Sequence, residues 1–233
     1  CSSEEIKNRT LDKFEYDEAD LRMIYNGVDF SRYGTLTTEI QKDKLRNKFG
    51  FDTKRPMVMF AGNFSKLKGV DVLLKADKAL CEDKEVVPFY LVMLGNGDCE
   101  EVHEIEQELI ESQVLVRYPF RDPIPFYDMS DIFVLPSVTE GFPMVTIEAM
   151  ASRLITIRSK AGGAFDQINH GENGFLFDIG DSATLEELLK EVVIRLSEFD
   201  GMREAAWLKV KDHFTSECMC QQTLAAYKTV VDD

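Results

Sequence analysis

Short apolar runs recur along the chain and are separated by longer amphipathic stretches. Six runs rich in β-branched and aromatic residues span 57–61, 89–94, 114–118, 132–135, 154–157 and 175–177. Most of them are continuous rather than alternating, which is typical of strands buried on both faces of a parallel sheet. The pattern therefore predicts six buried strands.

Helical spacing appears between these runs. Val70, Leu73, Leu74, Asp77 and Leu80 follow the 3.6-residue spacing of a helix after the first run, and Asp77 is the one charged residue among them. Residues 100–111 have apolar side chains on one helical face and acidic side chains on the other. Residues 144–152 form an apolar stretch after the fourth run. Strand and helix alternating in this way predict an α/β fold, a doubly wound parallel sheet of the Rossmann-like kind.

The two ends of the chain follow other patterns. The last fifty residues show no strand pattern and predict three C-terminal helices over 184–198, 202–213 and 216–231. Near the start, we expect a helix over 2–14, a strand over 21–25, and a helix over 37–49 that ends at Gly50. Because one helix and one strand precede the main sheet, the first thirty residues are expected to belong to a neighbouring unit.

Charge narrows the range of partners. The chain has 42 acidic and 27 basic residues, a formal charge of −15 on 233 residues. Nucleic acid and anionic lipid are polyanions, so this negative field disfavours both as the main partner. A hydrophobic content of 44% is that of a globular protein rather than a disordered one. No uncharged run reaches the roughly 18 residues of a membrane span, so no transmembrane segment is expected.

Cysteine and histidine usage argues against a metal or disulfide scaffold. The five cysteines include no C-x-x-C pair, and the three histidines lie far apart in the sequence. We therefore expect no zinc site and no disulfide framework. This cysteine usage is typical of a protein in the reducing cytosol. The chain starts with Cys1 rather than methionine, which suggests a fragment of a longer protein.

Candidate chemistry lies in the loops after the strands, because an open parallel sheet binds ligands beyond the carboxyl ends of its strands. The loop from Gly62 to Gly69 follows the first strand and carries Lys66 and Lys68. It leads into a helix whose N-terminus favours an anion. It lacks the G-K-[ST] ending of a Walker A loop.

Two carboxylates flank the loop after the fourth strand. Glu140 and Glu148 are eight residues apart in a segment otherwise free of charge, and Pro143 suits the first helical position. Glu148 lies on an apolar helix, where a carboxylate is costly unless it accepts hydrogen bonds. The donors are either the hydroxyls of a ligand or a cluster of backbone groups with a structural role. With the Gly162–Gly163 pair after the fifth strand, these loops predict a phosphorylated ligand.

Several longer motifs occur together and in order. Residues 136–150 read P-S-x-x-E-G-F-x-x-V-x-x-E-A-M, and residues 161–177 read A-G-G-A-x-x-Q-I-x-x-G-x-x-G-F-L-F. Residues 24–29 read I-Y-N-G-V-D, and K-G-V-D-V-L-L spans 68–74. Over residues 20–230 the chain resembles the donor-binding domain of a family 4, GT-B-fold retaining glycosyltransferase.

The resemblance implies a division of the chain and a set of partners. Residues 1–29 would be the tail and junction of a mostly missing N-terminal acceptor domain, and residues 30–233 the nucleotide-sugar donor-binding domain. A saccharide or lipid-linked acceptor would bind through the missing domain. The protein would act in the cytoplasm, with any contact to the inner membrane face made by the missing half. The isolated fragment is expected to be inactive.

The resemblance also implies roles for single residues. Glu140 and Lys68 would be catalytic, Glu140 against the donor sugar and Lys68 against the diphosphate. Glu148 would accept hydrogen bonds from the ribose hydroxyls. The remaining donor-binding residues would be Gly62, Asn63, Gly141, Phe142, Met144, Val145 and Arg121. No D-x-D motif occurs, and the family's chemistry implies no metal and no cofactor, only a nucleoside-diphosphate sugar as substrate.

Three positions depart from the family pattern. Asn63 stands where the family usually has an arginine that binds the diphosphate, so Lys66 or Arg158 would have to substitute for it. Pro143 and Arg153 each replace a common glycine. These departures keep a second hypothesis open, a noncatalytic nucleotide-binding or scaffold module of the same fold. A third hypothesis is a GT-B-fold epimerase or phosphorylase, although the phosphorylase's cofactor-binding lysine motif is not found.

Overall fold

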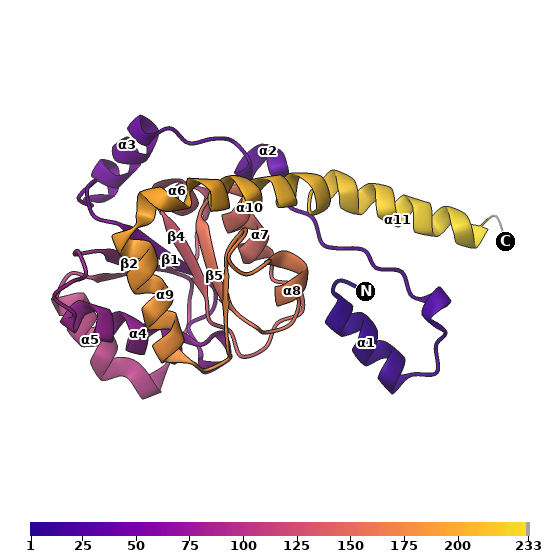
Figure 1. The fold of residues 1–233 in the computed structure, drawn as a ribbon, viewed down its shortest axis with the longest axis horizontal. Helices are drawn as coiled ribbons and strands as arrows, with labels where there is room; N and C mark the ends of the chain where they lie inside the picture. The colour runs from indigo at the N-terminus through magenta and orange to yellow at the C-terminus, as the bar shows by residue number, and fades with distance from the viewer. Residues whose placement is uncertain (232–233) are drawn as a thin grey trace.

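A single parallel sheet organises the molecule (Figure 1). The computed structural model describes residues 1–231, and in it six strands are arranged in the order β3-β2-β1-β4-β5-β6. They are β1 Met57–Ala61, β2 Tyr90–Leu94, β3 Leu115–Tyr118, β4 Ile132–Leu135, β5 Ile155–Ser159 and β6 Phe175–Phe177. Every neighbouring pair is parallel. The prediction of a doubly wound α/β sheet is confirmed, and each strand lies within two residues of its expected bounds.

The continuous apolar runs are explained by burial on both faces. All residues of β1, β4, β5 and β6 are buried, and only the first residue of β2 is partly exposed. At about 25 cal/mol per Å² of apolar surface, this burial is the main favourable term in folding. One large core cluster surrounds the sheet, and a second, smaller one lies around Phe142 and Phe214.

Helices cover both faces of the sheet. The chain order is α1 Glu4–Lys13, α2 Phe30–Tyr33, α3 Glu39–Phe49, α4 Val70–Glu82, α5 His103–Glu111, α6 Ile124–Met129, α7 Met144–Ala151, α8 Ala164–Gln167, α9 Ser182–Ile194, α10 Asp200–His213 and α11 Ser216–Val231. Helix α4 packs against α5 and α9, while α7 packs against α10 and α3 against α6. In a doubly wound sheet of this order, the crossover helices that follow β1 and β2 lie on one face, and those that follow β4 and β5 lie on the other.

Two local predictions are wrong. Residues 21–25 form no strand, because no neighbouring strand offers them a hydrogen-bonding partner. Instead, Tyr25 packs its ring against Phe142 and Phe214, with centroids 5.3 and 5.2 Å away. Pro143 is the N-cap of α7 rather than its first helical residue, since its ψ of 123° is extended. Gly50 does end α3, in the left-handed conformation expected of it.

A segment near each end of the chain takes part in one contact outside the sheet. Val28 forms an isolated parallel bridge with Thr215: the Val28 N–H donates to the Phe214 carbonyl, and the Ser216 N–H donates to the Val28 carbonyl, both at 2.9 Å. Helix α11 then runs past the sheet as a long extension (Figure 1). The division of the chain at residue 30 stays a prediction. Across residues 1–231, no helix is long and apolar enough to cross a membrane.

Candidate functional site

A cavity of about 480 Å³ opens at the carboxyl ends of β1 and β2. This is the point where the strand order reverses between β1 and β4, the place where doubly wound sheets bind ligands. Its lining comes from five separate parts of the chain: Tyr33, Ala61, Gly62, Asn63, Lys68, Leu94, Gly95, Asn96, Phe120, Pro123, Tyr127, Val145 and Glu148. The predicted residues Gly62, Asn63, Lys68, Val145 and Glu148 thus meet around one space.

Close backbone contacts between loops shape this cavity. A Cβ on Gly95 would lie 1.8 Å from the Gly62 carbonyl oxygen, and one on Gly69 would lie 1.9 Å from the Pro136 carbonyl oxygen. Any side chain at either position would push the loops apart. Gly69 also has a φ of 68° and is the N-cap of α4, so it turns the chain from the Lys66–Lys68 turn into the helix.

Glu148 projects into the cavity from α7. The Tyr127 hydroxyl donates to Glu148 Oε2 at 2.9 Å, and Tyr127 itself is almost completely buried. Burial raises the pKa of the Glu148 carboxyl above its usual value, and hydrogen bonding from the Tyr127 and Tyr33 hydroxyls offsets part of that rise. The carboxylate keeps unused lone pairs beside the cavity, as a hydroxyl-bearing ligand would require.

Lys68 and Glu140 form an ion pair at the edge of the same cavity. Lys68 Nζ lies 2.7 Å from Glu140 Oε1, and the exposed fractions of the two side chains are 31% and 9%. Lys68 is the one basic side chain among the residues described as lining the cavity. An anion that enters the cavity would therefore meet Lys68 and compete with Glu140 for it.

The other predicted donor-binding residues lie at different distances from the cavity. The Phe142 ring is buried between Tyr25 and Phe214, and Met144 packs against the same cluster, so neither side chain lines the cavity. Gly141 lies against Ile6 of α1, whose Cδ1 would be 3.3 Å from a Cβ placed there. These residues can act on a ligand through backbone groups at the start of α7.

Arg121 is not among the residues that line the cavity. Its guanidinium lies over the Tyr118 ring, 5.1 Å from the centroid, and its Nε donates to the Pro119 carbonyl at 3.4 Å. Its neighbour Phe120 lines the cavity instead, with 74% of the residue exposed.

Neither proposed substitute for the missing arginine reaches the cavity. Lys66 pairs with Glu101 at 3.0 Å, and Arg158 is completely buried. At the third departure, Arg153 takes a φ of 60° at the end of α7, a left-handed conformation that glycine adopts freely.

Several cavity residues were not predicted from the sequence, among them Gly95, Asn96, Tyr33 and Tyr127. Gly95 and Asn96 follow β2 directly, so a glycine at a strand end was a signal that could have found them. Tyr33 and Tyr127 carry no comparable signal. One lies on the short helix α2 and the other on α6, and packing on Glu148 brings them together.

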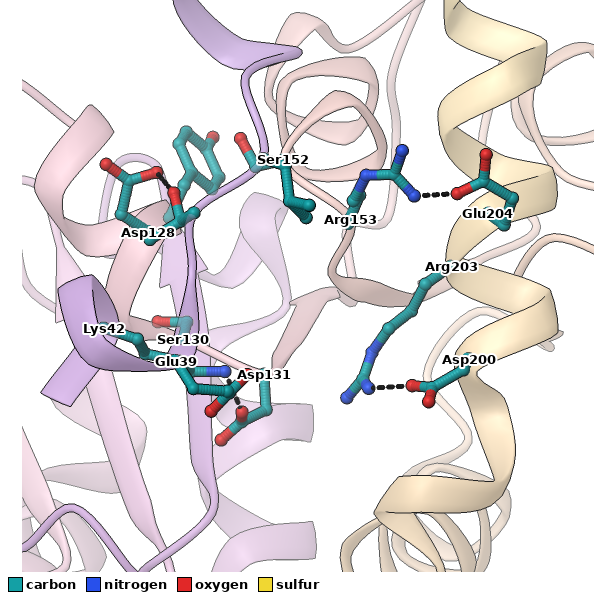
Figure 2. A pocket seen from close by; sticks show the side chains of 13 residues that line it. Glu39, Lys42, Asp128, Ser130, Asp131, Ser152, Arg153, Asp200, Arg203 and Glu204 are labelled. Carbon is teal, nitrogen blue, oxygen red and sulfur yellow. Dashed lines mark hydrogen bonds and ion pairs between the residues drawn. The ribbon is translucent and has the colours of Figure 1, made fainter.

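A second cavity of about 290 Å³ lies at the amino ends of β4 and β5 (Figure 2). Six of its eight charged side chains already pair with each other: Lys42 with Asp131, Arg203 with Asp200 at 2.8 Å, and Arg153 with Glu204. With their charges neutralised by each other and no strand carboxyl end nearby, these groups offer less to a ligand than the first cavity does.

One group in the described part of the chain has metal-ligating geometry. Ligand atoms of Asp98, His103 and Glu106 lie within 4.8 Å of one another, outside the cavity. These atoms already have partners. His103 Nε2 and Asp98 Oδ1 are 2.6 Å apart, and Arg117 Nη1 donates to Glu106 at 2.5 Å. A guanidinium on one ligand opposes a bound cation.

Comparison with known proteins identifies the family. The family model described as "Glycosyl transferases group 1" matches residues 41–204, which hold the sheet and all of the cavity lining except Tyr33. The chain belongs to the group 1 glycosyl transferases. The expected glycosyltransferase family and Rossmann-like, GT-B-type fold are confirmed, whereas membership of family 4 and the donor-binding role stay predictions.

Individual curated relatives are also glycosyltransferases by name. The capsular polysaccharide biosynthesis glycosyltransferase CapM of Staphylococcus aureus is 25% identical over 89% of this chain and 54% of its own length. A GDP-mannose-dependent alpha-mannosyltransferase of Corynebacterium glutamicum is 30% identical over 88% of this chain and 46% of its own. The group 1 chain therefore spans about half the length of these curated relatives.

A solved structure shows the same fold. HepE of Anabaena, determined in complex with UDP-glucose, superposes with a TM-score of 0.85 at 22% identity, covering 98% of this chain and 63% of HepE. Because the sequence identity is 22%, this superposition shows only that the two proteins share the arrangement of the sheet and helices.

Proposed function

We propose that this chain is the donor-binding half of a retaining glycosyltransferase that moves a sugar from a nucleoside diphosphate to an acceptor. The observation that carries the proposal is the meeting of Glu148 and Lys68 in one cavity at the switch point of the sheet. One supplies a hydrogen-bond acceptor for sugar hydroxyls and the other a cation for phosphate. Relatives named as glycosyltransferases and a neighbour solved with UDP-glucose support it.

Each residue then has a role in the proposed complex. Glu148 accepts hydrogen bonds from the ribose, while Lys68 leaves Glu140 to neutralise the diphosphate. Glu140, freed from that ion pair, faces the donor sugar. The loop of Gly62 and Asn63 and the backbone around Gly141, Phe142, Met144 and Val145 border the phosphates. With no metal in the proposed mechanism, Lys68 and the N-terminus of α7 stabilise the leaving diphosphate.

The acceptor and the cellular location belong to the proposal as well. The curated relatives are about twice as long as this chain, and we place the acceptor site in the part they have beyond the matched region. Free cysteines at all five positions are consistent with a reaction in the reducing cytoplasm.

A thermal-shift panel tests the proposed function. UDP, GDP, ADP and CMP are titrated against the 233-residue chain, and a nucleoside diphosphate is expected to raise the melting temperature by mass action on the folded state. Glu148→Ala should abolish most of this shift. Glu111→Ala, an exposed glutamate on α5, is the control that should keep it. If Glu148→Ala binds as tightly as the unchanged chain, the assignment of the ribose is wrong.

One observation favours the noncatalytic alternative. With Asn63 in place of arginine and with Lys66 and Arg158 both outside the cavity, Lys68 is the sole basic side chain described in its lining. Asn63→Arg restores the second charge, and a charge-assisted contact is worth about 1.5–3 kcal/mol. We expect tighter diphosphate binding. An unchanged or weaker affinity would favour a binding module whose loop departs from the enzyme geometry.

A further inference from the structure

Arg158 is the largest side chain among the completely buried residues of the described chain. It stands near the carboxyl end of β5, with no surface exposed to solvent. Burial lowers the pKa of its guanidinium to about 10, so the group stays charged at neutral pH. Within residues 1–231 no carboxylate forms an ion pair with it; Glu140, Asp166 and Glu5 act on it only through space. A buried charge is costly unless hydrogen bonds satisfy it.

The hydrogen bonds of Arg158 all go to one loop and the helix after it. Nη2 donates to the carbonyl oxygens of Ala161 and Gly162, each at 3.0 Å, and Nε donates to the Ser159 carbonyl at 3.3 Å. Nη1 donates to Gln167 Oε1 at the end of α8. A planar guanidinium can serve these diverging acceptors together, which a lysine ammonium cannot.

That loop in turn supports the segment that carries Glu140. A Cβ on Gly162 would lie 2.2 Å from the Glu140 carbonyl oxygen, and one on Gly163 would lie 2.6 Å from that of Gly141. The two backbones are therefore in direct contact. Gln167 Nε2 donates to the Pro143 carbonyl at 3.0 Å, which joins the Arg158 network to the start of α7.

We propose that Arg158 is a positioning residue that holds the 161–164 loop as a rigid support for the Glu140 segment. The support fixes the Glu140 carboxylate beside Lys68, and this inference rests on the proposed function in placing Glu140 at the donor sugar. Arg158 thus contributes to the site without touching the ligand.

Hydrogen–deuterium exchange tests the support in the absence of any ligand. In Arg158→Met and Arg158→Lys, amides of residues 137–144 and 161–167 are expected to exchange about tenfold faster, ahead of those in the sheet. Arg46→Lys is the matched control. Arg46 is also buried, but it hydrogen-bonds Met129 and Asp131 at the opposite edge of the sheet. Unchanged exchange in residues 137–144 of Arg158→Met, or an equal increase in Arg46→Lys, would overturn the proposal.

A second variant keeps the test open if Arg158→Met fails to fold. Gly162→Ala places a methyl group against the Glu140 carbonyl without altering the guanidinium. It should raise exchange in residues 137–144 in the same way. A Gly162→Ala chain with native exchange in that segment would contradict the support.

Binding then shows whether the support matters for the donor. Calorimetry compares UDP with UDP-glucose, or GDP with GDP-mannose, using the pair that the unchanged chain binds. The Arg158 and Gly162 variants should lose about tenfold in affinity for the sugar nucleotide and keep their affinity for the diphosphate. A purely structural role would weaken both alike, and this outcome, or a retained preference for the sugar nucleotide, refutes positioning.

The two proposals fail in different ways. If the unchanged chain binds none of these compounds, the proposed function falls, while the exchange experiment still decides whether Arg158 supports the loop. If it binds the diphosphate with no preference for the sugar ester, Glu140 does not face the sugar, and the positioning role for donor binding is refuted.

Discussion

Asp77 lies in the apolar layer of α4, completely buried, and its two carboxylate oxygens have no hydrogen-bond partner in the structure. Burial raises the pKa of this carboxyl well above its ordinary value. Folding therefore favours the protonated form of Asp77. The stabilising effect of that protonation is fully present below the unfolded-state pKa and is lost as the pH rises toward the folded-state pKa.

Asp77→Asn should therefore remove a pH dependence. In the unchanged chain, this carboxyl is expected to lower the free energy of unfolding by up to about 1.4 kcal/mol for each pH unit above its unfolded-state pKa. The variant has no carboxyl at this position and should not show that decrease. Urea unfolding at pH 5 and pH 8 measures the difference. Asp43→Asn, on the exposed face of α3, is the control. Equal pH dependence in Asp77→Asn and the unchanged chain would show that the carboxyl is ionised in the folded state.

Lys66 and Lys68 give a second prediction at the scale of the residue. They lie two positions apart, but Lys68 lines the cavity and Lys66 pairs with Glu101 outside it. Lys68→Ala should weaken diphosphate binding by about 1.5–3 kcal/mol and leave nucleoside binding nearly unchanged, because the charge meets phosphate and not the base. Lys66→Ala should change neither. Calorimetry with UDP and uridine checks this, and equal losses in the two variants would place the phosphates elsewhere.

At the scale of the element, the contact between the β1–α4 loop and the end of β4 depends on Gly69. Gly69→Ala adds a left-handed strain of about 1–2 kcal/mol and a methyl group 1.9 Å from the Pro136 carbonyl. Gly50→Ala is a matched control, because Gly50 has a φ of 82° and open space around its Cβ position. In chemical denaturation, Gly69→Ala should lose more unfolding free energy than Gly50→Ala. It should also bind the diphosphate more weakly. A loss equal to that of Gly50→Ala would mean that the loop moves freely.

Strands and helices were the most predictable elements because their signals are local. Continuous apolar runs place β1, β4 and β6 to within a residue, since burial on both faces needs no information from elsewhere in the chain. Residues 21–25 have the same composition as a strand, yet they lack a partner, and pairing depends on distant sequence. The site follows the same rule. Gly62 and Lys68 are predicted from the loop after a strand and Glu148 from a carboxylate on an apolar helix, whereas Tyr33 and Tyr127 reach Glu148 through tertiary packing alone.

At the scale of the whole molecule, the proposed reaction needs more than the donor cavity. Transfer requires an acceptor held against the donor sugar and water excluded from it. We expect the 233-residue chain to bind a nucleotide and to transfer no sugar. Radiolabelled sugar transfer and donor hydrolysis, with and without a reconstructed N-terminal half, measure this. Robust turnover by the chain alone would show that the acceptor site lies within it.

The bridge between Val28 and Thr215 has a consequence for engineering. Since these two residues are hydrogen-bonded neighbours through Phe214 and Ser216, the stretch between them begins and ends at one point outside the sheet. A short linker could close it into a ring, and new ends could be opened at the exposed turn of Gly171 and Glu172, giving a circular permutant with every strand still in register. The same stretch could be inserted into a loop of another protein as a self-contained cassette.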